Sequence, residues 1–204
     1  MSWSSKVIFL WLVAVTPSGA QDWRTSSEDP CACTDSMPFI IGRRSPVTTE
    51  AEVAAMVRDS AADSCRVSRL AVEALKDANH PTATEALVTA LSSRACAIRA
   101  SAAYSLIRHR SDAVAPALTR LLSDDDRRVR QAGAYALGRH PYRAANPMLV
   151  KLLADSSKHV RQAAVEALGR SGDATVRDEV AALASDPEPH VRQAVAEALQ
   201  RLAG

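Results

Sequence analysis

Hydrophobic and polar positions repeat every 31 residues along about three quarters of the chain. The clearest copy is Val-Arg-Gln-Ala-Ala-Val-Glu-Ala-Leu-Gly-Arg, residues 160–170, and close copies begin at Val129 and Val191. Fainter copies begin at Val67 and Ile98, so five copies follow one another without an insertion or deletion. A repeat of this length is typical of helical hairpins that stack on one another and bury a continuous core.

Each unit of the repeat divides into two helical segments joined by a polar turn. The first segments carry apolar residues three or four positions apart, as in Val53 and Met56 or Leu149 and Leu153, which places both on one helix face. The second segments start in a column that holds Pro189 in the last unit, and proline is tolerated at a first helical position. The sequence therefore predicts second helices that start near residues 65, 96, 127, 158 and 189.

The residues around the second segments carry the usual signals for helix ends. The column directly before the starts reads Ser64, Ala95, Asp126, Ser157 and Glu188. Serine and aspartate in this column are favoured N-caps. We expect two of the second helices to end near Gly138 and Gly169, and Thr49 to Glu52 has the capping-box pattern that opens the repeat domain, residues 49–204.

The first 20 residues have the pattern of an export signal. Lys6 precedes nine apolar residues, Val7 to Val15, and the small residues Ser18-Gly19-Ala20 follow. This apolar run is shorter than the ~20 residues that span a bilayer. We therefore expect a cleaved signal peptide, residues 1–20, no stable membrane insertion afterwards, and an exported protein that is periplasmic or secreted. An uncleaved anchor is the alternative.

Four cysteines follow the signal: Cys31, Cys33, Cys65 and Cys96. An even number in an exported chain indicates disulfides, with three possible connectivities. Pairs that join Cys31 and Cys33 to Cys65 and Cys96 would fix the N-terminal arm, residues 21–48, over the first two units. A direct Cys65–Cys96 bond needs Cα atoms within about 7 Å, less than the expected spacing of stacked units, but neighbouring turns can approach each other, so this pairing stays open. The alternative for the arm is a disordered linker.

The motif Asp-x-x-x-x-Val-Arg-x-x-Ala-x-x-Ala-Leu-Gly, seen in residues 155–169, resembles the HEAT repeat, and most of all its short bacterial variety, the phycobilisome-lyase-type repeat. The resemblance implies an all-α fold, an α-solenoid of about five stacked hairpins. It also implies a ladder in which a turn aspartate of one unit pairs with an arginine of its neighbour. The ladder positions are Asp124, Asp155, Asp186, Arg99, Arg130, Arg161 and Arg192. The first two units depart from the pattern, with Ala62 and Ser93 in the aspartate column and Ser68 in the arginine column.

In this family the second helices line the concave face, which is the usual binding surface. Their exposed columns here hold tyrosine, glutamine, glutamate and arginine, residue types that protein-binding surfaces tend to use. The candidate binding residues are Tyr104, Tyr135, Gln131, Gln162, Glu166, Gln193, Glu197, Arg139 and Arg170, with Arg108 and Arg201 in the same arginine column. The alternative is an ordinary solvated helix face.

Composition and spacing argue against several other kinds of site. A formal net charge of +2 without a basic run makes nucleic acid an unexpected partner, because phosphate binding needs a concentrated basic face. His109 and His140 share one column and His159 and His190 another, but stacked units lie roughly 10 Å apart, too far for a shared zinc ion. Deoxyhypusine hydroxylases, enzymes of the HEAT-repeat family, bind iron through His-Glu pairs, and this sequence has none. We expect no metal and no cofactor.

These observations favour an exported, non-catalytic scaffold that binds an unidentified protein or peptide on its concave face. The competing hypothesis is a lyase-like or accessory enzyme that acts on a small molecule or a modified side chain through Cys65 or Cys96, at helix N-termini that favour the thiolate. A third possibility is self-association through the C-terminal helix, where Val195 and Leu199 would meet a second copy.

Thiol trapping in the purified mature protein separates the first two hypotheses. If the cysteines form disulfides, a maleimide reagent added under denaturing conditions without reductant will label none of the four, and all four after reduction. Mass spectrometry counts the labels. A thiol that is labelled before reduction would contradict the disulfide prediction and support cysteine chemistry.

Overall fold

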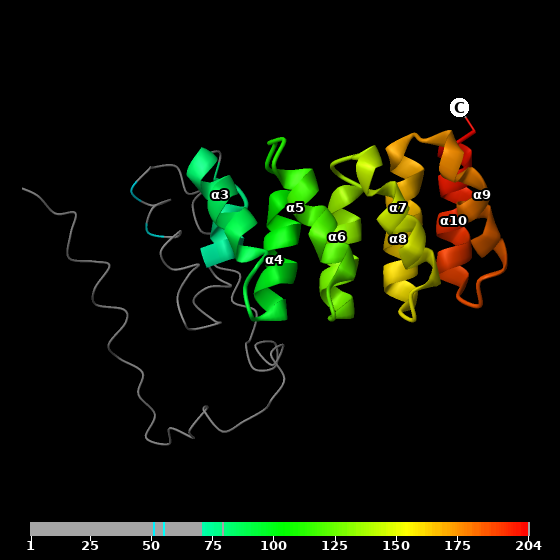
Figure 1. Ribbon diagram of the computed structural model, residues 1–204, viewed down its shortest axis with the longest axis horizontal. Coiled ribbons are helices and arrows are strands. Elements are labelled where there is room, and N and C mark those ends of the chain that lie inside the picture. The colour runs from blue at the N-terminus through cyan, green and yellow to red at the C-terminus, as the bar shows by residue number, and fades with distance from the viewer. Residues whose placement is uncertain (1–50, 52–54, 56–70, 79, 204) are drawn as a thin grey trace, which may run out of the picture.

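The computed structural model describes residues 51, 55, 71–78 and 80–203. The predicted signal peptide (1–20), the arm (21–48), the capping box at Thr49, Cys31, Cys33, Cys65 and the second helix expected near residue 65 lie outside the described residues. Within the described ranges every regular element is helical. Figure 1 shows these helices side by side in chain order from α3 to α10, so the predicted all-α solenoid of stacked hairpins is confirmed.

Each described hairpin pairs a first helix with a second helix. The first helices are α3 (Pro81–Ala90), α5 (Val114–Arg120), α7 (Asn146–Lys151) and α9 (Arg177–Ala181). The second helices are α4 (Cys96–Leu106), α6 (Arg127–Leu137), α8 (Lys158–Ser171) and α10 (Pro189–Arg201), and they begin in the column where the repeat places their starts. Short 3-10 turns flank the later first helices: η2 (Leu121–Ser123), η3 (Arg143–Ala145), η4 (Leu152–Ala154), η5 (Ala174–Val176) and η6 (Ala182–Ser185).

The core repeats with the units. One leucine column, Leu75, Leu106, Leu137 and Leu168, is fully or almost fully buried. A valine column at the start of the second helices is equally buried, at Val129, Val160 and Val191. These residues belong to one hydrophobic cluster that runs through the stack, apart from Val191, which is buried at its end. Each unit therefore completes its own core only when its neighbours are in place, as expected for a solenoid.

Glycine sets the closest approach between second helices. Gly169 lies inside α8, and a Cβ at this position would stand 2.6 Å from the Cβ of Ala198 on α10 and 2.8 Å from its Cα. The helix continues to Ser171 and ends at Gly172, whose φ of 63° is the left-handed conformation that favours glycine. The helix thus ends two residues beyond Gly169, because Gly169 serves packing and Gly172 serves termination, whereas α6 ends at Gly138 as predicted.

Val195 is buried, whereas the predicted self-association requires it on the surface. Its side chain is buried at 1% exposure inside the last hairpin, and Leu199 is partly buried. Val195 is therefore not available to a second copy, and that part of the prediction is wrong.

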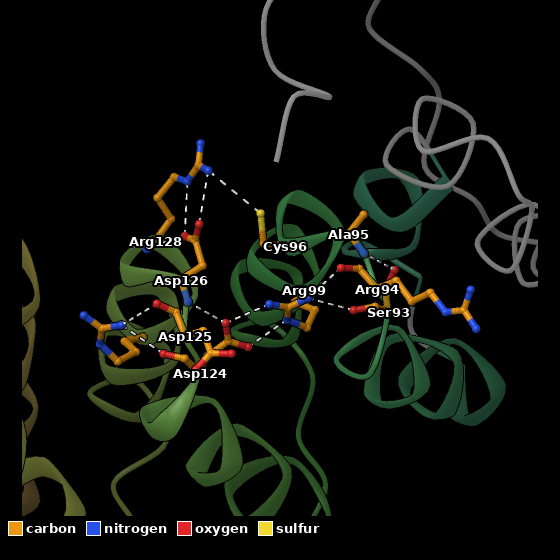
Figure 2. A network of polar contacts seen from close by, with 10 residues as sticks. Ser93, Arg94, Ala95, Cys96, Arg99, Asp124, Asp125, Asp126 and Arg128 are labelled. Carbon is orange, nitrogen blue, oxygen red and sulfur yellow. Dashed lines mark hydrogen bonds and ion pairs between the residues drawn. The ribbon is translucent and has the colours of Figure 1, made fainter. Parts of the chain in front are cut away.

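Arginine–aspartate pairs join each unit to the next. The Nε and Nη2 atoms of Arg130 donate to both carboxylate oxygens of Asp155, at 2.7 and 3.1 Å, while its Nη1 donates to two backbone carbonyls in its own turn. Arg99 binds Asp124 and Arg161 binds Asp186 in the same two-pronged way. Figure 2 shows Arg99 between Asp124 and the carbonyl groups of the turn before α4. Such bidentate, charge-assisted pairs are among the stronger hydrogen-bonded contacts in proteins.

The same aspartates also fix the turns before the second helices. Oδ1 of Asp155 accepts a hydrogen bond from the Ser157 amide at 2.8 Å, and Asp124 and Asp186 do the same two residues on. Ser157 and Glu188, in the expected N-cap column, make no side-chain cap bond, whereas Asp126 caps α6 at the Arg128 amide. The turn aspartate thus takes over part of the capping function.

Replacing one ladder carboxylate tests how much the pairing contributes to stability. Asp155→Asn removes the charge that faces Arg130, whose side chain is 17% exposed against 7% for the aspartate. We expect the free energy of unfolding, measured by urea denaturation, to fall by about 2–4 kcal/mol, because the guanidinium keeps its burial and loses its counter-charge.

The matched control is Glu197→Gln, which removes a carboxylate from the exposed pair with Arg201 at 3.4 Å. A surface pair of this kind contributes at most about 1 kcal/mol. Equal losses in the two variants would contradict a special role for the ladder.

Two buried histidines form a second link between units. Nε2 of His109 donates to the Leu75 carbonyl at 3.1 Å, and Nε2 of His140 donates to the Leu106 carbonyl at 2.9 Å, each at the end of the preceding second helix. Because Nε2 faces a carbonyl it carries the proton, so Nδ1 of His109 accepts from the Thr84 hydroxyl at 2.8 Å. Burial lowers the pKa of both histidines. Their shared column thus reflects inter-unit hydrogen bonding.

This burial predicts a pH dependence of stability. Since the pKa of His109 and of His140 is lower in the folded chain, the unfolded chain binds more protons, so their contribution is complete above the unfolded pKa of about 6.5 and is lost as pH falls below it. We expect the free energy of unfolding to drop between pH 7.5 and 5.5, by no more than about 1.4 kcal/mol per pH unit for each histidine. The pKa of the ladder aspartate Asp186 is lowered chiefly by the hydrogen bond from Arg161. Protonation of such aspartates reduces the free energy of unfolding only below about pH 4.

The double variant His109→Gln, His140→Gln should lose this slope between pH 7.5 and 5.5. A slope that persists in the double variant would show that other groups cause it.

Candidate binding face on the second helices

The second helices form one row of the stack. Each of α4, α6 and α8 packs directly on the second helix that follows it, whereas contacts between successive first helices are sparse. The first helices pack against this row, as α5 does on α6 and α7 on α8. We call the surface of this row that faces away from the first helices the second-helix face.

The predicted binding residues lie on the second-helix face at intervals of four along each helix. Gln131, Tyr135 and Arg139 follow one another on and after α6, and the equivalent positions on α8 are Gln162, Glu166 and Arg170. Gln193 and Glu197 continue the pattern on α10, and Tyr104 begins it on α4. All of these side chains are exposed or partly exposed. The predicted residues thus occupy equivalent positions on, or directly after, successive second helices.

Two tyrosines form the aromatic part of this face. The rings of Tyr104 and Tyr135, on adjacent helices, lie with centroids 5.8 Å apart and planes tilted by 56°. Tyr104 remains 43% exposed. Partial burial, and then the nearby Tyr135, raise the pKa of Tyr104, so the Tyr104 hydroxyl is neutral at physiological pH. In a chain with only 4% aromatic residues, this is an unusual concentration of ring surface.

Arg139 extends the aromatic pair with a positive charge. Its guanidinium carbon lies 5.6 Å from the centre of the Tyr135 ring, and its Nη2 donates to the Tyr135 hydroxyl at 3.3 Å. A guanidinium at this distance is attracted by the electron-rich ring face. The contact leaves Arg139 largely exposed beside the rings.

The later units replace tyrosine by glutamate and are more polar. Nε2 of Gln162 donates to Glu166 at 3.0 Å, and Nε2 of Gln193 donates to Glu197 at 3.2 Å. Arg201 adds a hydrogen bond to Glu197 at 3.4 Å. The face thus changes along the stack, from aromatic and cationic on α4 and α6 to hydrogen-bonded and partly acidic on α8 and α10.

Arg170 has the most unusual surroundings on this face. Its Nη1 lies 3.3 Å from the place where a Cβ on Gly138 would stand, so the guanidinium packs against α6. This Nη1 is buried and has no hydrogen-bond partner among the described residues. Buried polar groups are nearly always paired, so an unpaired guanidinium nitrogen makes Arg170 a candidate functional residue.

The structure also shows a cleft that the sequence analysis missed. It has a volume of about 800 Å³ and lies between α3 and the connection from α4 to α5. Lys76, Glu85 and Arg110 contribute to its walls, and Arg108 pairs with Asp77 there at 2.9 Å. The charged residues next to these turns were visible in the sequence, but their meeting depends on the spacing of the units.

Cys96 begins α4 and is buried, at 2% exposure. It is not a free thiol, and its partner falls outside the described residues, so the pairing of the four cysteines stays a prediction. Figure 2 shows Arg128 reaching toward Cys96, with Nη2 3.9 Å from the sulfur.

Among the described residues, no three His, Cys, Asp or Glu side chains lie close enough to hold a metal ion. None of the described helices has the length and apolar character needed to cross a bilayer.

Solved structures of several repeat proteins resemble this chain. The complex of CpcE and CpcF of phycocyanin lyase from Nostoc sp. PCC7120 matches with a TM-score of 0.69 at 23% identity, over 82% of this chain and 70% of that one. A designed armadillo repeat protein in complex with the peptide (KR)4 matches with a TM-score of 0.61 at 18% identity, over 74% and 82%. Human deoxyhypusine hydroxylase in complex with glycerol matches with a TM-score of 0.51 at 23% identity, over 76% and 63%. At sequence identities this low, the three matches show a shared fold alone.

No curated protein sequence matches this chain at a significant level. The family model for HEAT repeats matches residues 53–138 and 146–204, which is most of the chain. This match agrees with the stacked hairpins and the arginine–aspartate ladder, and the chain belongs to the HEAT-repeat family.

Proposed function

We propose that this chain is an exported, non-catalytic scaffold that binds a protein or peptide along the second-helix face. The observation that carries the proposal is the exposed Tyr104–Tyr135 pair with Arg139 beside it. Tyrosine and arginine are enriched where protein interfaces concentrate binding energy, because each combines a large apolar area with hydrogen-bond donors. The polar glutamine and glutamate side chains that continue the face would fix the position of a bound segment.

Relatives in fold support binding as the general role. One matched structure is a complex of two chains, CpcE and CpcF, and another holds the peptide (KR)4 on a designed armadillo repeat protein. Export is supported by the sequence of residues 1–20 and by four cysteines in the remaining chain. We propose that disulfides attach the arm, residues 21–48, to the first units.

The competing proposal is a lyase-like or accessory enzyme. It is favoured by the likeness to phycocyanin lyase, and deoxyhypusine hydroxylase also has this fold. A thiol mechanism through Cys96 is disfavoured, because this cysteine is buried and is not a free thiol. A small molecule on this chain would instead be expected in the cleft next to α3, which is concave and lined by charged side chains.

Capture of a partner in cells tests the scaffold. The tagged full chain is crosslinked in the cell that exports it and compared with the triple variant Tyr104→Ala, Tyr135→Ala, Gln162→Ala. We expect the parent to retain a specific protein and the variant to retain at least about tenfold less of that protein. Each aromatic anchor at an interface contributes roughly 1–2 kcal/mol or more to binding.

The matched control is Tyr142→Ala, which removes an exposed tyrosine from the connection between α6 and α7, away from the second-helix face. Circular dichroism must show that all variants remain folded. Equal capture by parent and triple variant would place the binding site elsewhere, and absence of any captured protein would favour the enzyme proposal.

A further inference from the structure

We propose that Tyr104, Tyr135, Arg139 and Arg170 form one subsite for an extended partner segment in which an acidic side chain lies two residues from an aromatic or aliphatic side chain. The inference rests on the proposed function and adds the chemistry of the segment that the second-helix face recognises. It assigns the carboxylate to the two guanidiniums and the apolar side chain to the tyrosine rings.

The first argument is the unequal pairing of one arginine column. Arg108 pairs with Asp77 at 2.9 Å, Arg139 binds the Tyr135 hydroxyl, and Arg201 binds Glu197 at 3.4 Å. Arg170 occupies the same column, and its Nη1 has no hydrogen-bond partner among the described residues. Arg139 and Arg170 are therefore the two positions of this column that form no ion pair within the described residues.

The second argument is that Arg170 is held in place. Its Nη1 packs 3.3 Å from the Cβ position of Gly138 and is shielded from water. A side chain at Gly138 would occupy that space, so the glycine is needed for the guanidinium to pack there. The guanidinium is thus partly desolvated, and a carboxylate that binds its remaining donors would form charge-assisted hydrogen bonds, which are stronger than neutral ones. A side chain restrained in this way also loses less entropy on binding.

The third argument is the position of the aromatic pair. Arg139 directly follows Gly138 in the chain, so the two guanidiniums approach the same end of α6. The Tyr135 ring lies under Arg139, and Tyr104 continues the ring surface onto α4. Side chains two residues apart in an extended segment point to the same side, so such a pair can place an apolar group on the rings and a carboxylate at the arginines.

Glu166 is the opposing charge near this subsite. Its carboxylate accepts from Gln162 at 3.0 Å. The hydrogen bond with Tyr135 is the main cause that raises the pKa of Arg139, and Glu166 adds to it. Two guanidiniums against one carboxylate leave the subsite positive. Removal of Glu166 should therefore strengthen binding of an acidic segment and weaken binding of a basic one.

Two blocked peptides, acetyl-Gly-Phe-Ser-Asp-Ser-Gly-amide and the same peptide with Lys in place of Asp, test the assignment. Titration of the ¹⁵N-labelled mature chain at low salt, followed by NMR, gives the dissociation constant and the location of binding. We expect the Asp peptide to bind about tenfold or more tightly than the Lys peptide, which is the effect of a hydrogen bond to a charged group. The shifted signals should lie on α4, α6 and α8.

Three variants sharpen the test. Arg170→Gln should reduce the affinity for the Asp peptide to that for the Lys peptide, whereas Arg201→Gln, in the same column one unit on, should leave it unchanged. Glu166→Gln should increase the affinity for the Asp peptide, and it decides the question if Arg170→Gln fails to fold. The melting temperature of Arg170→Gln should not fall, because the side chain makes no hydrogen bond within the described residues.

Equal or tighter binding of the Lys peptide would overturn the inference, and so would insensitivity to both Arg170→Gln and Glu166→Gln. If that binding still depends on Tyr135, the proposed scaffold function stands while the assignment of an acidic segment fails. Shifts confined to the cleft next to α3, or no binding of either peptide, also overturn the inference. In those cases partner capture decides the scaffold function separately.

Discussion

Contact between neighbouring units depends on a carboxylate–guanidinium pair that each turn shares with the preceding second helix. The aspartate accepts two hydrogen bonds from the arginine and one from the backbone of its own turn, and the arginine also donates to two carbonyls. Nearly every polar atom of the pair is therefore satisfied despite partial burial. This completeness matters, because a half-satisfied ionic group inside a repeat stack would cost more than an apolar one.

The ladder, the histidine bonds and the glycine contacts act at different places along the second helices. Arg99 and Asp124 join α4 and α6 where these helices begin, and His140 joins them at the other end, where it reaches the last turn of α4. At the junction of α8 and α10 the ladder pair is Arg161 with Asp186, and Gly169 and Ala198 bring the helix backbones together. Since these contacts hold neighbouring second helices at more than one point, side chains on the face that they present keep their relative positions.

The sequence predicted the regular parts of this structure well, and for a physical reason. Residues that recur every 31 positions experience the same surroundings in each unit, so the columns showed which side chains point to the core, to the ladder and to the face. Exceptions within a column were harder to interpret. Gly169 looked like a helix end, but its role depends on Ala198 in the next unit, and Val195 looked exposed until the rest of its hairpin was in place. Likewise, Nη1 of Arg170 has no hydrogen-bond partner among the described residues, and the repeat columns of the sequence could not show this.

The constant spacing of the ladder has a consequence for how such a chain can change its length. Arg99, Arg130 and Arg161 each bind an aspartate 25 residues further along, always across one junction and never across two. Arg192, the fourth predicted ladder arginine, donates only to the carbonyl groups of Asp186 and Pro187 in its own turn. Duplicating one 31-residue unit in the gene would therefore insert a hairpin that brings both a matching donor and a matching acceptor. Every old junction would keep its partners, and the second-helix face would grow by roughly one helix diameter, about 10 Å. The length of the stack can thus increase by duplication of units, without changes to the units already present.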